Sequence, residues 1–122
     1  MKLLIADDET SIRGLVRVTL EGQGFEIFEA ADGEAAMEIA RAEQPALILL
    51  DVMMPRLDGL EVCRRLKGDP ATKGIIVVLL TAMAQDNDRE RGLSAGADDY
   101  LTKPFSPLAL MKMVDAVRAE RR

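Results

Sequence analysis

The sequence contains no histidine and no tryptophan, and it has only one cysteine. Without histidine the chain offers no Ser-His-Asp or Cys-His catalytic arrangement, no histidine ligand for zinc, and no residue that could carry phosphohistidine. The single thiol, Cys63, cannot form an internal disulfide, which favours a reducing compartment such as the cytoplasm.

The chain is also poor in aromatic residues (3%) and has no long apolar segment at its start, where Asp7 and Asp8 interrupt the apolar residues 3–6. That interruption comes too early for a signal peptide or a membrane span. The net charge of −5 disfavours direct binding to nucleic acid or to an anionic membrane, because both need a positive surface. The 122 residues, 48% of them hydrophobic, predict one globular domain over residues 1–122, with a core of aliphatic side chains and methionine.

Short apolar runs alternate with segments whose apolar residues recur at helical spacing. The predicted strands are residues 3–6, 26–30, 46–50, 75–80 and 100–101. Three of them are almost continuously apolar, as strands covered on both faces require, whereas residues 26–30 alternate as an edge strand would. The helical stripes are Ile12, Leu15, Val16 and Leu20; Ala36, Ile39 and Ala40; and Leu110, Val114 and Val117.

Capping residues agree with this division into elements. Ser106 followed by Pro107 is a typical helix start, and Gly68 and Gly96 are typical helix ends. About five strand–helix alternations predict an α/β fold: a doubly wound parallel sheet between two layers of helices, joined by right-handed crossovers.

Polar residues follow the predicted strands: Asp7 and Asp8 after the first, Asp51 after the third, Thr81 after the fourth and Lys103 after the fifth. Binding and catalytic sites of open α/β sheets lie at the carboxyl ends of the strands. If the first strand is central and the third, fourth and fifth lie in order beside it, all of these side chains face one pocket.

Three carboxylates in one pocket repel one another, by about 3 kcal/mol for charges about 5 Å apart at an effective dielectric of about 20. Lys103 supplies only one positive charge, and oxygen ligands that leave room for water suit Mg²⁺ better than Zn²⁺ or Ca²⁺. A metal, a hydroxyl and a lysine together can gather phosphoryl oxygens, and the nucleophile that remains is a carboxylate. The predicted chemistry is the formation of an acyl phosphate.

The sequence also resembles a known protein family, and the resemblance covers essentially the whole chain. Four segments resemble, in order and spacing, the motifs of response-regulator receiver domains: Asp7-Asp8, Leu49–Pro55 with Asp58-Gly59, Leu80–Ala82, and Gly96–Phe105. The resemblance implies a flavodoxin-like receiver fold with five helices and strand order 2-1-3-4-5.

The same resemblance implies a role for each motif residue. Asp51 is similar to the phosphoacceptor. Asp8, Asp51 and the backbone carbonyl of Met53 would ligate Mg²⁺ directly, and Asp7 would act largely through water. Thr81 and Lys103 would each bind a phosphoryl oxygen, Tyr100 matches the aromatic switch position that turns inward with Thr81, and the Lys103-Pro104 bond resembles a cis peptide of the family.

The implied function is that of a cytoplasmic two-component switch, not of an enzyme acting on external substrates. The implied partners are a sensor histidine kinase as phosphodonor and a downstream protein or fused output domain, with a possible phosphorylation-dependent homodimer. The segments 89–100 and 103–107 resemble receivers whose outputs are winged-helix DNA-binding domains. Met113 and Asp115 depart from the basic residues that are common in that subfamily.

Other interpretations of these residues stay open at this stage. Asp7 and Asp8 could simply cap the following helix. A haloacid-dehalogenase-like phosphatase also combines an Asp nucleophile, Thr, Lys and Mg²⁺, although its nucleophile normally comes first in the chain and is followed two residues later by an acid. An unphosphorylated adaptor with the same fold is a further alternative. Met53 and Met83 occupy the variable positions two residues after Asp51 and Thr81, and neither can activate water, so we expect slow loss of the phosphoryl group.

Overall fold

The computed structural model describes residues 1–82 and 86–120, and in them strands and helices alternate along the chain. The strands are β1 (Lys2–Ala6), β2 (Glu26–Ala30), β3 (Leu47–Asp51), β4 (Ile76–Thr81) and β5 (Asp99–Thr102). The helices are α1 (Thr10–Leu20), α2 (Gly33–Glu43), α3 (Gly59–Gly68), α4 (Asp86–Ser94) and α5 (Pro107–Glu120).

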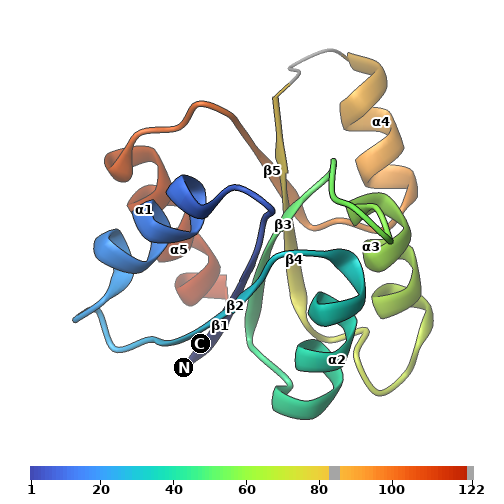
Figure 1. The fold of residues 1–122 in the computed structure, drawn as a ribbon, viewed down its shortest axis with the longest axis horizontal. Helices are drawn as coiled ribbons and strands as arrows, with labels where there is room; N and C mark the ends of the chain where they lie inside the picture. Colours follow the sequence, from blue (N-terminus) through green and yellow to red (C-terminus); the bar gives the residue numbers. More distant parts are fainter. Residues whose placement is uncertain (83–85, 121–122) are drawn as a thin grey trace.

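All five described strands run parallel in one sheet, in the order β2-β1-β3-β4-β5 (Figure 1). The predicted fold class and strand order are therefore confirmed, and each strand begins and ends within one residue of its predicted bounds. The edge position predicted for residues 26–30 is also confirmed, since β2 pairs only with β1 among the described strands.

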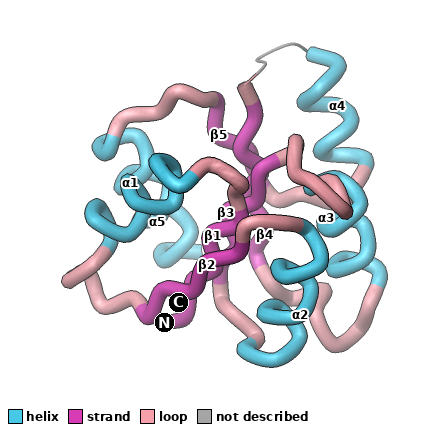
Figure 2. Tube along the Cα trace, in the orientation of Figure 1, coloured by secondary structure: helices cyan, strands magenta, loops and turns pink. Residues whose placement is uncertain are grey.

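Helices cover both faces of the sheet, with α1 and α5 on one face and α2, α3 and α4 on the other (Figure 2). Because successive side chains of a strand point to opposite faces, each inner strand contributes to two apolar cores. Leu3 and Ile5 pack with residues of α1 and α5, whereas Leu4 and Ala6 pack with residues of α2 and α3. No helix among the described residues is long and apolar enough to cross a bilayer.

The helix ends follow the predicted capping residues. Helix α5 begins at Pro107, and the Ser106 Oγ accepts a hydrogen bond from the Ala109 N–H at 3.0 Å. Helix α3 ends at Gly68, and Gly96, just after α4, has a φ of +94°, which glycine adopts without strain.

Backbone hydrogen bonds continue one residue past the strand ends. The Asp7 N–H donates to the Ala30 carbonyl at 3.0 Å, the Val52 N–H to that of Leu80 at 3.1 Å, and the Lys103 N–H to that of Thr81 at 2.7 Å. The residues that follow β1, β3 and β5 are thus held in register with the neighbouring strands.

Gly59 lets the start of α3 pack directly against the end of β3. A Cβ at this position would lie 2.0 Å from the Asp51 carbonyl oxygen and 3.0 Å from the Val52 Cα. The Gly59 N–H also donates to the Val52 carbonyl at 2.9 Å. Only glycine permits this close approach of one backbone to another.

We expect Gly59→Ala to destabilise the fold by about 1–3 kcal/mol, because the backbone of Asp51 must move to admit the methyl group. Gly68→Ala is the matched control: a Cβ there has nothing within 4 Å, so its stability should change little or rise by up to about 1 kcal/mol. Urea unfolding of both variants measures this, and equal stabilities would contradict the close packing at Gly59.

Candidate functional site

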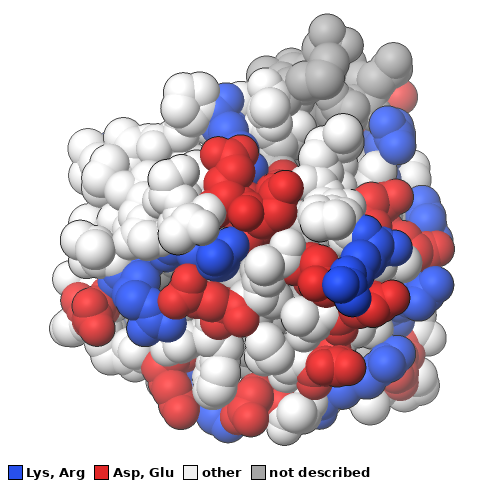
Figure 3. All heavy atoms as spheres, viewed as in Figure 1, with Lys and Arg blue, Asp and Glu red and all other residues white. Residues whose placement is uncertain are grey.

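Three carboxylates converge where β1 and β3 end. Asp7, Asp8 and Asp51 each place an oxygen within 4.8 Å of the other two. Asp7 is fully buried and Asp51 is 5% exposed, whereas Asp8 is open to solvent. On the face seen in Figure 3, acidic side chains gather near the connection from β1 to α1. The structure thus brings together the acidic residues selected from the sequence.

Asp7 and Asp8 are not the cap of the helix that follows. The N-cap residue of α1 is Glu9, and no side chain caps its first turn. Asp7 instead turns back on its own loop, where its Oδ1 accepts a hydrogen bond from the Glu9 N–H at 2.9 Å. The capping alternative for this pair is therefore wrong.

Lys103 projects from the end of β5 into the acidic cluster. Its Nζ lies 2.7 Å from Asp7 Oδ2, 3.3 Å from Asp51 Oδ1 and 3.8 Å from Glu9 Oε1, and its side chain is only 11% exposed. The following peptide, Lys103–Pro104, is cis, as the resemblance implied. One ammonium group thus faces several carboxylates, and negative charge remains in excess.

The pKa of Asp51 is raised from 3.8 to about 6. Burial is the largest cause and the neighbouring charge of Asp7 is the second, while Lys103 acts in the opposite direction. Burial alone would lower the pKa of Lys103, but its contacts with Asp7 and Asp51 outweigh burial, and the pKa is raised. Lys103 therefore stays charged, and Asp51 is largely ionised at neutral pH.

Asp8 and Asp51 open into a cleft of about 560 Å³, which is also lined by Met53, Thr81 and Lys103. The Met53 N–H donates to Asp51 Oδ1 at 3.3 Å, and the Met53 side chain is 78% exposed. Thr81, at the end of β4, is 9% exposed.

Tyr100 lies on β5, next to this cleft. It is half-buried and lines an adjoining cavity together with Thr81, Val52 and Ala97. The two predicted switch residues are therefore neighbours in space, and their coupling stays a prediction. The other variable position, Met83, lies outside the described residues.

Sequence reasoning missed three charged residues that line the same cleft: Glu9, Asp58 and Arg91. The position of Glu9 directly after Asp8 could have indicated that Glu9 also lies near the cleft. Asp58 accepts from the Glu61 N–H at 2.9 Å and so caps α3. Arg91 comes from α4, and no local pattern predicts which way a helix turns its side chains relative to a distant strand end.

The donor set fits a hard divalent cation. Asp7 Oδ2 is buried, and the ammonium group beside it, Lys103 Nζ at 2.7 Å, is shared with Asp51 and Glu9. A buried oxygen in this condition, beside two further carboxylates, favours a bound cation. Carboxylates that open onto a solvent-filled cleft suit Mg²⁺, which keeps several of its waters.

The one thiol of the chain does not compete as a nucleophile. Cys63 is buried on α3, where its Sγ lies 3.5 Å from the Ala95 carbonyl oxygen. Burial raises the pKa of the Cys63 thiol to about 11, so the reactive thiolate is scarce at neutral pH. Asp51 remains the nucleophile that the cleft offers.

Comparison with protein families finds one matching model, the response regulator receiver domain, over residues 3–115. The chain is 46% identical over 116 residues to the alkaline phosphatase synthesis transcriptional regulatory protein PhoP of Bacillus subtilis. It is 43% identical over 116 residues to the DNA-binding dual master transcriptional regulator RpaA of Synechocystis. Each match covers 95% of this chain and 48% of the relative, so the chain spans about half the length of these proteins.

Solved structures give the same result. The chemotaxis protein CheY4 of Vibrio cholerae superimposes with a TM-score of 0.89 at 34% identity, over 95% of this chain and 97% of that one. The receiver domain of the sensor histidine kinase PA1611 of Pseudomonas aeruginosa superimposes with a TM-score of 0.86 at 30% identity, over 94% of both chains. That structure is described as having a magnesium ion coordinated in the active site cleft.

The raised pKa of Asp51 predicts a pH-dependent stability in metal-free buffer. The folded chain holds this proton up to about pH 6, but the unfolded chain only up to about pH 4. The stabilising contribution of the group is therefore complete below about pH 4 and is lost as the pH rises through about 6. The amide of an Asp51→Asn variant cannot ionise, so in EDTA we expect its free energy of unfolding to exceed that of the wild type by about 3 kcal/mol near neutral pH.

Urea unfolding in EDTA across this pH range measures the difference, which should shrink toward pH 4. Asp115→Asn is the control, because Asp115 is exposed on α5 and does not line the cleft. The stability of Asp115→Asn to urea should equal that of the wild type at every pH. A constant advantage of Asp51→Asn at all pH values would show that ionisation of Asp51 does not strain the fold.

Proposed function

This chain belongs to the response-regulator receiver family, and on that premise we propose that it is a Mg²⁺-dependent signalling switch of the cytoplasm, phosphorylated on Asp51 by a sensor histidine kinase. The observation that carries the proposal is the position of Asp51: a nearly buried carboxylate within 3.3 Å of Lys103 Nζ and beside Asp7 and Asp8. The motifs, the strand order and this geometry all support it.

The proposed step is a direct transfer to the Asp51 carboxylate. One carboxylate oxygen attacks phosphorus, the bond from phosphorus to the kinase imidazole nitrogen breaks, and its electron pair stays on the imidazole. With a pKa of about 6, Asp51 is mostly ionised and nucleophilic at neutral pH. Lys103, already within the cluster, compensates negative charge on a phosphoryl oxygen as it arrives.

Asp8, Asp51 and the backbone carbonyl of Met53 would hold Mg²⁺, with Asp7 acting through water. The bound ion would neutralise phosphoryl oxygens, which the excess of carboxylates would otherwise repel. The fit of the donor set and the magnesium ion of the PA1611 receiver domain support this assignment.

Thr81 and Tyr100 are the residues proposed to respond to phosphorylation of Asp51. Thr81 lines both the cleft and the cavity beside Tyr100, so a shift of Thr81 toward a phosphoryl oxygen would vacate space into which the ring can turn. The recipient is a downstream protein or a fused output domain, with a phosphorylation-dependent homodimer as one form of output. The transcriptional regulators of twice this length support a fused output.

We expect no turnover of an external substrate, which separates the switch from the phosphatase alternative. That alternative has no support from the comparisons, where the matching family model is the receiver domain. A phosphatase would release phosphate from esters repeatedly, whereas a receiver is labelled once per chain.

Incubation with acetyl phosphate and Mg²⁺ should add one phosphoryl group per chain, detected by intact mass, because acetyl phosphate replaces the kinase as donor. Asp51→Asn should remove the label completely, and EDTA should remove it from the wild type. Asp115→Asn, an equal loss of one negative charge outside the cleft, should be labelled like the wild type. Labelling that survives in Asp51→Asn would refute the assigned acceptor.

The exposed Met53 side chain at the cleft predicts a long-lived acyl phosphate, because a thioether cannot orient an attacking water. We expect Met53→Asn to shorten the lifetime severalfold, measured by loss of the phosphoryl mass after the donor is removed. Val18→Asn is the matched control, since Val18 is also 78% exposed but lies on α1, outside the cleft. Equal lifetimes of the acyl phosphate in both variants would show that Met53 does not determine this lifetime.

A further inference from the structure

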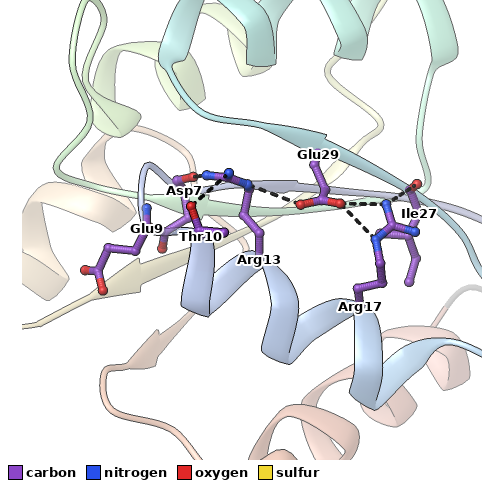
Figure 4. Close-up of polar contacts among 7 residues, drawn as sticks. All are labelled: Asp7, Glu9, Thr10, Arg13, Arg17, Ile27 and Glu29. Atoms are coloured by element: carbon purple, nitrogen blue, oxygen red, sulfur yellow. Dashed lines mark hydrogen bonds and ion pairs between the residues drawn. The ribbon is translucent and has the colours of Figure 1, made fainter.

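Two arginines on α1 share one carboxylate on the edge strand β2 (Figure 4). The Arg13 Nε donates to Glu29 Oε1 at 3.2 Å, and the Arg17 Nε donates to Glu29 Oε2 at 2.8 Å. The arginines lie one helical turn apart, so both reach the same acceptor. The function proposed above uses none of these residues.

The two arginines differ in what their other nitrogens contact. The Arg13 Nη1 donates to the carbonyl oxygen of Asp7 at 2.8 Å, whereas the Arg17 Nη2 donates to the carbonyl oxygen of Ile27 at 3.3 Å. Arg13 is also the more buried of the two, with 17% of its side chain exposed against 39% for Arg17. Only Arg13 therefore reaches the acidic cluster.

The contact of Arg13 falls on the peptide that joins Asp7 to Asp8. The Asp7 N–H is already bonded to the Ala30 carbonyl at 3.0 Å, and its Oδ1 to the Glu9 N–H at 2.9 Å. The guanidinium in turn holds the backbone carbonyl of Asp7. The orientation of this carbonyl sets the direction in which the chain, and with it the Asp8 side chain, leaves the strand.

We propose that Arg13, braced by Glu29, is a positioning residue that presets the Asp7–Asp8 peptide and so raises the affinity of the acidic cluster for Mg²⁺. The inference rests on the proposed function, of which it explains one part. Groups that orient metal ligands without touching the metal commonly change its affinity by about 10–100-fold.

Charge alone makes the opposite prediction. Arg13 carries a positive charge next to a cation site, so its removal should strengthen Mg²⁺ binding if electrostatics were its only effect. Arg17 carries the same charge and shares Glu29, but it does not contact Asp7. The pair Arg13→Met and Arg17→Met therefore separates positioning from charge.

Calorimetric titration of each variant with Mg²⁺, without any phosphodonor, is the decisive experiment. We expect Arg13→Met to bind Mg²⁺ on the order of tenfold more weakly than the wild type, and Arg17→Met to bind as tightly or slightly more tightly. Equal changes in the two variants, or unchanged or tighter binding in Arg13→Met, would overturn the proposal. Absence of Mg²⁺ binding by the wild type would overturn it as well.

Thermal unfolding in EDTA checks that both variants fold. If Arg13→Met does not fold, Arg13→Lys replaces it, because lysine keeps the charge but lacks the planar fork that joins Glu29 to the Asp7 carbonyl. Mg²⁺ binding should then still weaken, whereas Arg17→Lys should bind like the wild type. Unchanged affinity in Arg13→Lys would then count against the proposal.

Labelling by acetyl phosphate supplies a second readout. The Mg²⁺ concentration for half-maximal rate should rise in Arg13→Met, while the rate at saturating Mg²⁺ should return to that of the wild type. A low rate at saturating Mg²⁺ would contradict a positioning role. If Mg²⁺ binding changes as expected but no variant or wild type is labelled, the proposed function fails and the role of Arg13 stands.

Discussion

The structure depends on a local excess of negative charge that the fold creates and does not fully neutralise. Asp7 and Asp51 are almost completely withdrawn from solvent, and a single ammonium group, that of Lys103, lies between them. Repulsion between buried carboxylates is costly where water cannot screen it. Burial is the largest cause of the raised pKa of Asp51 and the charge of Asp7 is the second. In the proposed function, such a cluster would accept first a cation and then a phosphoryl group.

The cluster is held from two sides by cations with different tasks. Lys103 enters from the end of β5 and meets the carboxylate oxygens, whereas Arg13 approaches from α1 and meets the backbone carbonyl of Asp7. Glu29 on β2 orients Arg13 from outside. Lys103 thus compensates charge within the cleft, whereas Arg13 holds the backbone behind it.

In the proposed function, a phosphoryl group on Asp51 would change this balance strongly enough to act as a switch. It brings a charge of about −1.5 to −2 into the cleft, next to Lys103 and Thr81. To turn a population from mostly one state to mostly the other requires about 5 kcal/mol of differential stabilisation, within reach of such a group paired with a metal and a lysine. Thr81 lines both the cleft and the cavity beside Tyr100, so the proposed change could pass from the cleft toward β5.

The sequence by itself determined the parallel α/β fold and most of the chemical groups of the site, because both follow from local order. Continuous apolar runs specify buried strands, and the polar residues after them, such as Asp51 and Lys103, must meet at one edge of a parallel sheet. Only the tertiary structure decided how those groups are charged and held. The burial that raises the pKa of Asp51 depends on how distant segments meet at the edge of the sheet. The reach of Arg13 to the Asp7 carbonyl depends on how α1 packs against the sheet, which the spacing of residues along a helix does not encode.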